Sequence, residues 1–149
     1  MLTGKVILVT GSSRGIGQAT AITLAKAGAQ LIIHGRTVES LNNTKKSLLE
    51  IGVEPFQVIY DVTDEVAMKK GIMEIKKEFG RLDGLVNNAG IMYEGLLGMV
   101  KKETVQQMLN INVTAVLQQM QFASRLMTKN ETSSIVNVSS IIGLQGAEG

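Results

Sequence analysis

Cysteine is absent from this chain of 149 residues, so a disulfide framework and a thiolate metal site are both excluded. No apolar run approaches the roughly 18 residues that a membrane-spanning helix needs. The chain also lacks internal repeats, low-complexity tracts and any histidine, aspartate and glutamate cluster with metal-ligand spacing. Its net charge of +2 is spread along the sequence, which gives no basic patch for nucleic acid or an anionic membrane.

What remains is the composition of a globular domain. Hydrophobic residues make up 44% of the chain and charged residues 19%, which is too apolar for a disordered protein. The length suits one domain with a sizeable core. An expected strand begins almost at the N-terminus, which leaves no room for a signal peptide. We therefore expect one cytoplasmic domain over residues 1–149, without a membrane or nucleic-acid partner.

Short runs of consecutive apolar residues alternate with helical patterns along the chain. Such runs are typical of strands that are covered on both faces, as in a parallel sheet. The alternation predicts an α/β fold with a doubly wound, mainly parallel sheet. Three of the helical patterns end at a glycine, as a left-handed C-terminal cap would, at Gly28, Gly52 and Gly80. The expected strands are 5–10, 30–34, 56–60, 82–87 and 134–138.

A longer helix is expected from about residue 103 to 127. Asn112 falls within its apolar stripe, where a polar amide is costly unless it is hydrogen-bonded, either to nearby backbone or in a site. Outside the stripe, Ile111, Phe122 and Leu126 lack an obvious partner within the chain. They indicate a second buried surface, the alternative being scattered exposed apolar residues. The stripe expected to face the sheet is Val105, Met108, Leu109, Val113, Val116, Leu117 and Met120.

The stretch TGSSRGIG, residues 10–17, lies between the first expected strand and the first helix. Backbone N–H groups at a helix N-terminus point at an anion, and glycines let the backbone approach a pyrophosphate closely. A glycine-rich turn without a ligand is the alternative, but a strand before and an amphipathic helix after favour a dinucleotide site. The predicted phosphate loop is Gly11, Ser12, Ser13, Arg14, Gly15, Ile16 and Gly17.

Two arginines indicate which dinucleotide is bound. Arg14 belongs to the predicted phosphate loop, and Arg36 follows the second strand, where the adenosine ribose would lie. NAD sites usually place an acidic residue there, whereas arginine suits the 2′-phosphate of NADP. The strand ends in His34-Gly35-Arg36 without an acid, so NADP is predicted, the alternative being two solvated surface arginines. His34, the single histidine, is interpreted as structural.

Four stretches in order resemble the short-chain dehydrogenases/reductases: residues 10–17, Asp61-Val62, Asn-Asn-Ala-Gly at 87–90 and Val-Asn-Val-Ser-Ser at 136–140. The resemblance implies a Rossmann fold, an adenine contact at Asp61 and Val62, and a cofactor-ribose contact at Asn88, Ala89 and Gly90. Within the family, the segment from 87 to 105 is most similar to bacterial 3-oxoacyl-(acyl-carrier-protein) reductases. Those enzymes tend to carry basic residues for an acidic carrier protein at the turn after the helix over 103–127. Here that turn reads Lys129-Asn130-Glu131, so the chain departs from their pattern at this position.

The same resemblance implies NADPH-dependent reduction of a carbonyl, with a 3-oxoacyl thioester as the expected substrate. Reduction or oxidation of another small alcohol or ketone stays open, as does a protein that binds a nucleotide without turnover. Ser140 is expected to hydrogen-bond the substrate carbonyl, and Asn112 to order a water in a proton relay. The resemblance also implies a homodimer or homotetramer, paired through the helix over 103–127.

The family's acid/base tyrosine, and the lysine one helical turn after it, belong further along the chain than Gly149. Tyr60 closes the third expected strand, and Tyr93 has no lysine one turn later, so neither is a substitute. We therefore expect the sequence to be the nucleotide-binding portion of a longer reductase and to be inactive alone.

Overall fold

Residues 2–96, 98–128 and 130–146 are described by the structure, which is a computed structural model. All its strands run parallel in one sheet, and each coincides closely with a run predicted as a strand. The predicted doubly wound parallel sheet is therefore confirmed. The strands are β1 (Val6–Val9), β2 (Gln30–Gly35), β3 (Phe56–Ile59), β4 (Gly84–Asn87) and β5 (Ser134–Asn137), in the spatial order β3-β2-β1-β4-β5.

Helices connect these strands. Gly28, Gly52 and Gly80 follow three of them with φ angles of 93°, 78° and 68°, so the predicted left-handed helix ends are confirmed. No helix within the described ranges is long and apolar enough to cross a membrane. The helical elements are α1 (Gly15–Lys26), a 3-10 turn (Glu39–Leu41), α2 (Asn42–Glu50), α3 (Glu65–Phe79), α4 (Lys102–Leu109), a π-helical turn (Asn110–Thr114), α5 (Ala115–Met127) and α6 (Ile142–Gln145).

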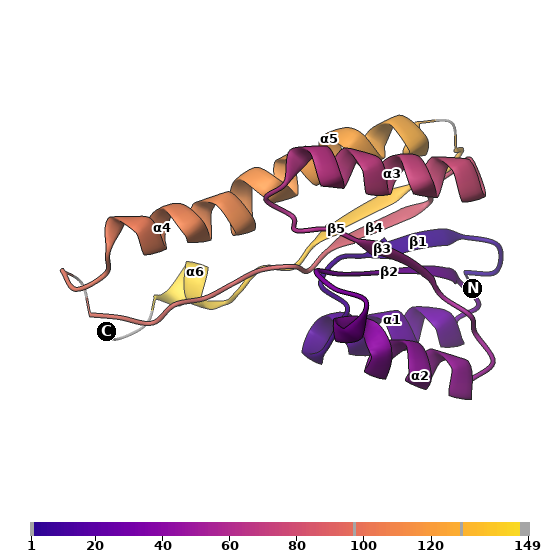
Figure 1. The fold of residues 1–149 in the computed structure, drawn as a ribbon, viewed down its shortest axis with the longest axis horizontal. Coiled ribbons are helices and arrows are strands. Elements are labelled where there is room, and N and C mark those ends of the chain that lie inside the picture. Colours follow the sequence, from indigo (N-terminus) through magenta and orange to yellow (C-terminus); the bar gives the residue numbers. More distant parts are fainter. Residues whose placement is uncertain (1, 97, 129, 147–149) are drawn as a thin grey trace.

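The sheet lies between two helical layers, with α1 and α2 on one face and α3 and α5 on the other (Figure 1). Alternate residues of β1 divide between the two cores: Val6 and Leu8 pack beneath α3 and α5, while Ile7 and Val9 pack beneath α1 and α2. This two-sided burial explains why the strand is apolar at consecutive positions. Parallel strands also bring all their carboxyl ends, and the loops that follow, to one edge.

The predicted long helix differs from expectation in its shape and in its buried face. A π-helical turn separates α4 from α5, and α4 projects beyond the sheet (Figure 1). Leu109 and Leu117, predicted to face the sheet, are 53% and 58% exposed. Asn112 is likewise exposed rather than part of a buried stripe.

The second apolar face predicted on this helix is corrected as well. Phe122 and Leu126 are buried in the core beneath α5, and Ile111 is half-buried, so these residues do not form a free surface. The wider π-helical turn changes the angular register between its two flanking helices. A single 3.6-residue repeat drawn through the whole segment therefore assigns the wrong face to α5.

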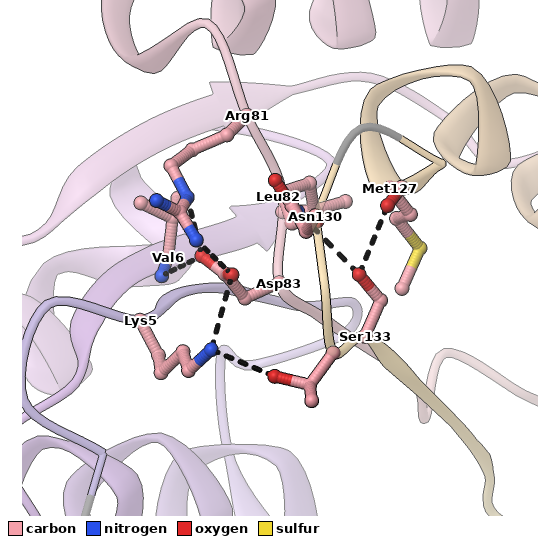
Figure 2. A network of polar contacts seen from close by, with 9 residues as sticks. Lys5, Val6, Arg81, Leu82, Asp83, Met127, Asn130 and Ser133 are labelled. Carbon is pink, nitrogen blue, oxygen red and sulfur yellow. Dashed lines mark hydrogen bonds and ion pairs between the residues drawn. The ribbon is translucent and has the colours of Figure 1, made fainter.

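A buried carboxylate joins the amino ends of the central strands (Figure 2). Asp83 accepts hydrogen bonds from the Val6 N–H at 3.0 Å and from Nε of Arg81 at 2.9 Å. Nζ of Lys5 lies 3.6 Å from its Oδ1. Burial alone would raise the pKa of Asp83, but these hydrogen bonds and the two cations together hold the pKa below its ordinary value.

The same network continues into the segment between α5 and β5 (Figure 2). The Asn130 side chain, in the turn over 129–131, donates to the Leu82 carbonyl at 2.7 Å. The Ser133 hydroxyl donates to the Met127 carbonyl at 3.1 Å. Lys129 of that turn lies outside the described residues. The contacts fix where β5 enters the sheet beside β4.

We predict that Asp83→Asn destabilises the fold by about 2 kcal/mol at neutral pH, the usual loss for hydrogen bonds to a charged group. Because the folded-state pKa is lowered, the ionised carboxylate stabilises the fold above the unfolded-state pKa, and this contribution is lost as pH falls through the folded-state pKa. The difference between variant and wild type should therefore shrink in acid. Urea unfolding at neutral pH and near pH 3 measures it.

Glu54→Gln is the matched control for this charge removal. The Glu54 side chain is 68% exposed and lies 3.4 Å from Nζ of Lys45, so its loss should cost at most about 0.5 kcal/mol. Equal stability of Asp83→Asn and Glu54→Gln at neutral pH would contradict a stabilising role for the Asp83 network.

Candidate active site

The loops that follow β1 and β4 are joined by one buried hydroxyl. Oγ1 of Thr10 donates to the Val86 carbonyl at 3.2 Å and accepts from the backbone N–H groups of Asn88 and Ala89 at 3.0 and 3.1 Å. The predicted phosphate loop and the Asn-Asn-Ala-Gly turn are thereby held side by side. Sequence reasoning did not assign Thr10 a role, although it opens the glycine-rich stretch.

Glycines permit this close approach. A Cβ atom on Gly11 would lie 2.8 Å from Cα of Ala89, and one on Gly17 would lie 2.5 Å from Nδ2 of Asn88. That same Nδ2 donates to the carbonyls of Thr10 and Gly11 at 3.1 and 3.0 Å. Gly11, Gly17 and Asn88, predicted as cofactor contacts, thus lie together in one compact edge.

The start of α1 presents unpaired donors at this edge. The first intrahelical hydrogen bond runs from the Gln18 N–H to the Arg14 carbonyl, and within the described ranges no protein group accepts from the N–H groups of Gly15, Ile16 and Gly17. The Ile16 side chain is 65% exposed despite being apolar. Arg14 precedes the helix in an extended conformation with its side chain exposed. These features fit a dinucleotide whose pyrophosphate lies on the helix N-terminus.

Ser12 has a different position from its neighbours. Its hydroxyl accepts from the His34 N–H at 2.9 Å, and its own N–H donates to the His34 carbonyl at 3.0 Å. Its carbonyl accepts from Oγ1 of Thr44 on α2 at 2.7 Å. Ser12 is fully buried, so it supports the loop from behind rather than offering its hydroxyl to a ligand. Ser13 is half-buried beside it. Thr44, which bonds to Ser12, was not predicted from the sequence as part of the site.

The carboxyl ends of β2 and β3 carry the next group of predicted residues. Arg36 is exposed just after β2, and Asp61 is exposed just after β3. Hydrogen bonds from the hydroxyl and N–H of Thr63 lower the pKa of Asp61, assisted by the charge of Arg36. Val62 is half-buried against the core. Arg36 and Asp61 thus share one surface beside the phosphate loop.

Asn112 lies where the helix widens into the π-helical turn. Its Oδ1 accepts from the Ile91 N–H at 2.9 Å, and its Nδ2 donates to the Ile91 carbonyl at 2.7 Å. A Cβ on Gly90 would lie 3.2 Å from the same Oδ1. The side chain therefore holds the turn after β4 against the helix. Hydrogen bonds to nearby backbone were one of the two roles that the sequence left open for Asn112, the other being a place in the site.

Ser140 follows β5 at the same edge, since Asn137 pairs in register with Asn87 of β4. Its exposed hydroxyl accepts from the Ile142 N–H at 3.3 Å, at the start of α6. The structure thus brings the Ser140 loop and the Asn88–Gly90 turn to neighbouring strand ends.

Each of the two tyrosines donates its hydroxyl to a glutamine side chain. Tyr60 is buried and donates its hydroxyl to Oε1 of Gln119 at 2.9 Å, and burial raises its pKa. The exposed hydroxyl of Tyr93 donates to Oε1 of Gln107 at 3.4 Å.

A cavity of about 360 Å³ lies elsewhere, between α3 and α5. It is lined by basic and apolar side chains, and none of the predicted site residues contributes to it. Across the described ranges, no three histidine, aspartate or glutamate side chains gather where they could hold a metal ion. The lining residues are Lys69, Ile72, Met73, Lys76, Gly80, Phe122, Arg125 and Leu126.

A parallel α/β sheet with a glycine loop after its first strand, at the carboxyl edge and before a helix, has the architecture of a dinucleotide-binding Rossmann protein. A family profile described as short chain dehydrogenase matches residues 5–149. The chain belongs to this family of oxidoreductases, close to the 3-oxoacyl-(acyl-carrier-protein) reductases.

Individual relatives differ in their activities. The chain is 37% identical over 150 residues to the 3-oxoacyl-[acyl-carrier-protein] reductase FabG of Thermotoga maritima, covering 99% of this chain and 60% of that protein. It is 35% identical over 140 residues to gluconate 5-dehydrogenase of Gluconobacter oxydans, covering 94% and 55%.

A solved structure has a similar fold. Carveol dehydrogenase from Mycobacterium avium, in complex with NAD, is 28% identical with a TM-score of 0.90, covering 97% of this chain and 57% of that protein. The chain thus spans about 60% of the length of the Thermotoga maritima reductase and slightly less of the gluconate and carveol dehydrogenases.

We predict different costs for the same substitution at two loop glycines. Gly11 and Gly15 have φ angles of 61° and 56°, so alanine at either should cost about 1–2 kcal/mol in the left-handed region. Only Gly11 is crowded by the Ala89 backbone, whereas nothing lies within 4 Å of a Cβ at Gly15. Gly11→Ala should therefore lose about 2 kcal/mol more.

Urea unfolding of the two variants measures this difference, with Gly15→Ala as the matched control for backbone strain. Equal losses would show that the loop after β4 moves away freely. The close packing of the two loops would then not constrain the site.

Proposed function

We propose that the protein that carries this chain is a cytoplasmic, NADPH-dependent reductase that transfers hydride to the carbonyl of a 3-oxoacyl thioester. The observation that carries the proposal is the joining of the glycine loop to the Asn88–Gly90 turn through Thr10, with Ser140 at a neighbouring strand end. The named reductase of Thermotoga maritima supports this choice of substrate. NADPH would supply the hydride when bound.

The chain's own residues have separable roles in this proposal. The N–H groups that begin α1 would hold the pyrophosphate, and the Ser140 hydroxyl would hold the substrate carbonyl oxygen. Asn112 positions the turn after β4 through Ile91, and its second amide hydrogen is left for the proposed water relay. With Tyr60 buried and Tyr93 bonded to Gln107, the acid is expected from outside the described residues, and the chain alone is expected to be inactive.

An alternative substrate class has specific support. The relative named gluconate 5-dehydrogenase differs little in identity from the named reductase, 35% against 37%. Oxidation of a small polyol acid is therefore the second candidate function.

An assay of a protein that carries the chain separates these candidates. Acetoacetyl-coenzyme A with NADPH and gluconate with NADP are supplied in parallel, and absorbance of the reduced nicotinamide is followed. Loss of absorbance with the thioester alone supports the proposal. Turnover of gluconate alone favours the second candidate. Binding of NADPH without turnover of either substrate would contradict both.

We predict that Arg36→Ala lowers the preference for NADPH over NADH by about ten- to a hundredfold, the loss of one hydrogen bond to a charged group. Arg36 and Arg14 are exposed, and within the described ranges neither forms an ion pair. Titration with both dinucleotides measures the change. Arg125→Ala is the control, because it removes an equal charge near the end of α5. An unchanged preference in Arg36→Ala would exclude this arginine as the discriminator.

We also propose that the protein is a homodimer or homotetramer, assembled through the α4–α5 segment. The residues differ from those the sequence indicated: Val105, Leu109, Val113 and Leu117 recur every fourth position and are exposed. The double variant Leu109→Glu with Leu117→Glu should dissociate the assembly, because charges are costly in an apolar interface. Val66→Glu on α3 is the control. Light scattering that finds a monomer in the wild type at micromolar concentration would contradict the proposal.

A further inference from the structure

The single histidine occupies a junction between three strand ends. His34 lies near the end of β2, between the glycine loop that follows β1 and the end of β3. It is only 2% exposed, and its ring centroid lies 4.1 Å from that of Tyr60. Its backbone exchanges hydrogen bonds with Ser12 of the glycine loop. The residue is thus enclosed by the elements that shape the proposed cofactor site.

Both ring nitrogens of His34 have partners, and the partners fix the tautomer. The Gly11 N–H donates to Nδ1 at 3.1 Å, so Nδ1 carries no proton. Nε2 lies 3.0 Å from the Tyr60 carbonyl, which can only accept, so Nε2 carries the proton. Burial lowers the pKa of His34 to about 4, in keeping with this neutral ring.

Gly11 depends on this acceptor. Gly11 has a left-handed φ of 61°. Because glycine adopts positive and negative φ about equally readily, its own preference does not fix this conformation, and contacts with its N–H and carbonyl must do so. Nδ2 of Asn88 holds its carbonyl at 3.0 Å, and Nδ1 of His34 is the partner found for its N–H within the described ranges. The Gly11 N–H belongs to the Thr10–Gly11 peptide, whose carbonyl accepts from Nδ2 of Asn88 at 3.1 Å. Without Nδ1 this partly buried N–H would lose its acceptor, and that peptide would be held at its carbonyl end but not at its N–H end.

We propose that His34 is a positioning residue of the cofactor site: its unprotonated Nδ1 orients the Gly11 peptide and thereby sets the phosphate loop for the dinucleotide. This inference rests on the proposed function for the identity of the cofactor. It assigns to the histidine a role beyond filling space between β2 and β3. The contact that carries it crosses 23 residues of sequence, from Gly11 to His34.

Two amide substitutions separate the two ring contacts. The amide oxygen of Asn in His34→Asn can replace Nδ1 as acceptor for Gly11, but the side chain is too short to reach the Tyr60 carbonyl. The longer amide in His34→Gln can replace Nε2 as donor to Tyr60, but leaves Gly11 without its acceptor. Both variants should lose stability, so stability alone does not distinguish them.

NADPH affinity and Gly11 amide exchange do distinguish the variants. Titration of the chain with NADPH should give a dissociation constant near the wild-type value for His34→Asn and about three- to tenfold higher for His34→Gln, the loss of one net hydrogen bond. Hydrogen exchange at the Gly11 amide, measured without cofactor, should be faster in His34→Gln only. Tyr60→Phe, which removes the hydroxyl bonded to Gln119, is the control and should leave both readouts unchanged.

The outcomes separate this inference from the proposed function. Equal NADPH affinities and equal Gly11 exchange in His34→Asn, His34→Gln and wild type would overturn the positioning role alone. A wild-type chain that binds neither NADPH nor NADH would overturn the proposed cofactor, and with it the cofactor role of His34. Selective loss in His34→Gln supports both.

Discussion

The hydrogen bonds of Thr10 are the constraint on which the candidate site depends. The buried hydroxyl of Thr10, which follows β1, bonds to the Val86 carbonyl near the end of β4 and to the N–H groups of Asn88 and Ala89 in the turn after β4. The two loops are thereby fixed so close that Gly11 and Gly17 have no room for a side chain. The glycine spacing is therefore a consequence of loop packing as much as of ligand access, which explains why these positions and Asn88 belong to one unit.

Further contacts extend this junction in two directions. Toward β2 and β3, the ring of His34 links Gly11 to the Tyr60 carbonyl. Toward α5, the amide of Asn112 holds Ile91 beside the π-helical turn. A π-helical turn leaves part of the backbone outside the regular ladder and often marks a functional position. Here it lies where the turn after β4 meets the helix, so the irregular backbone and the predicted site coincide.

The sequence was sufficient for elements whose signals are local. Apolar residues at consecutive positions predicted the strands, and the central strands β1, β2 and β4 are indeed covered on both faces, whereas the residues of β5 are exposed. Glycine positions predicted the helix ends. The buried face of α5 was not predictable in this way, since the π-helical turn breaks the period and α4 extends past the sheet. The contact of His34 with Gly11 depends on the register that pairs Val9 with Ile33, which no local pattern specifies.

The two edges of the sheet differ in the chemistry that stabilises them. At the amino edge an ionised aspartate, Asp83, is neutralised by Arg81 and Lys5. At the carboxyl edge the contacts of Thr10, His34 and the two asparagines are made by uncharged groups, and Asp83 at the opposite edge is the buried carboxylate among the described residues. Asp61 is the one carboxylate among the predicted cofactor residues, and Thr63 holds it at the exposed end of β3. Because neutral hydrogen bonds hold this edge together, the N-terminus of α1 and the exposed Arg14 and Arg36 are opposed there by Asp61 alone among the predicted cofactor residues, an arrangement that favours a phosphate-bearing ligand.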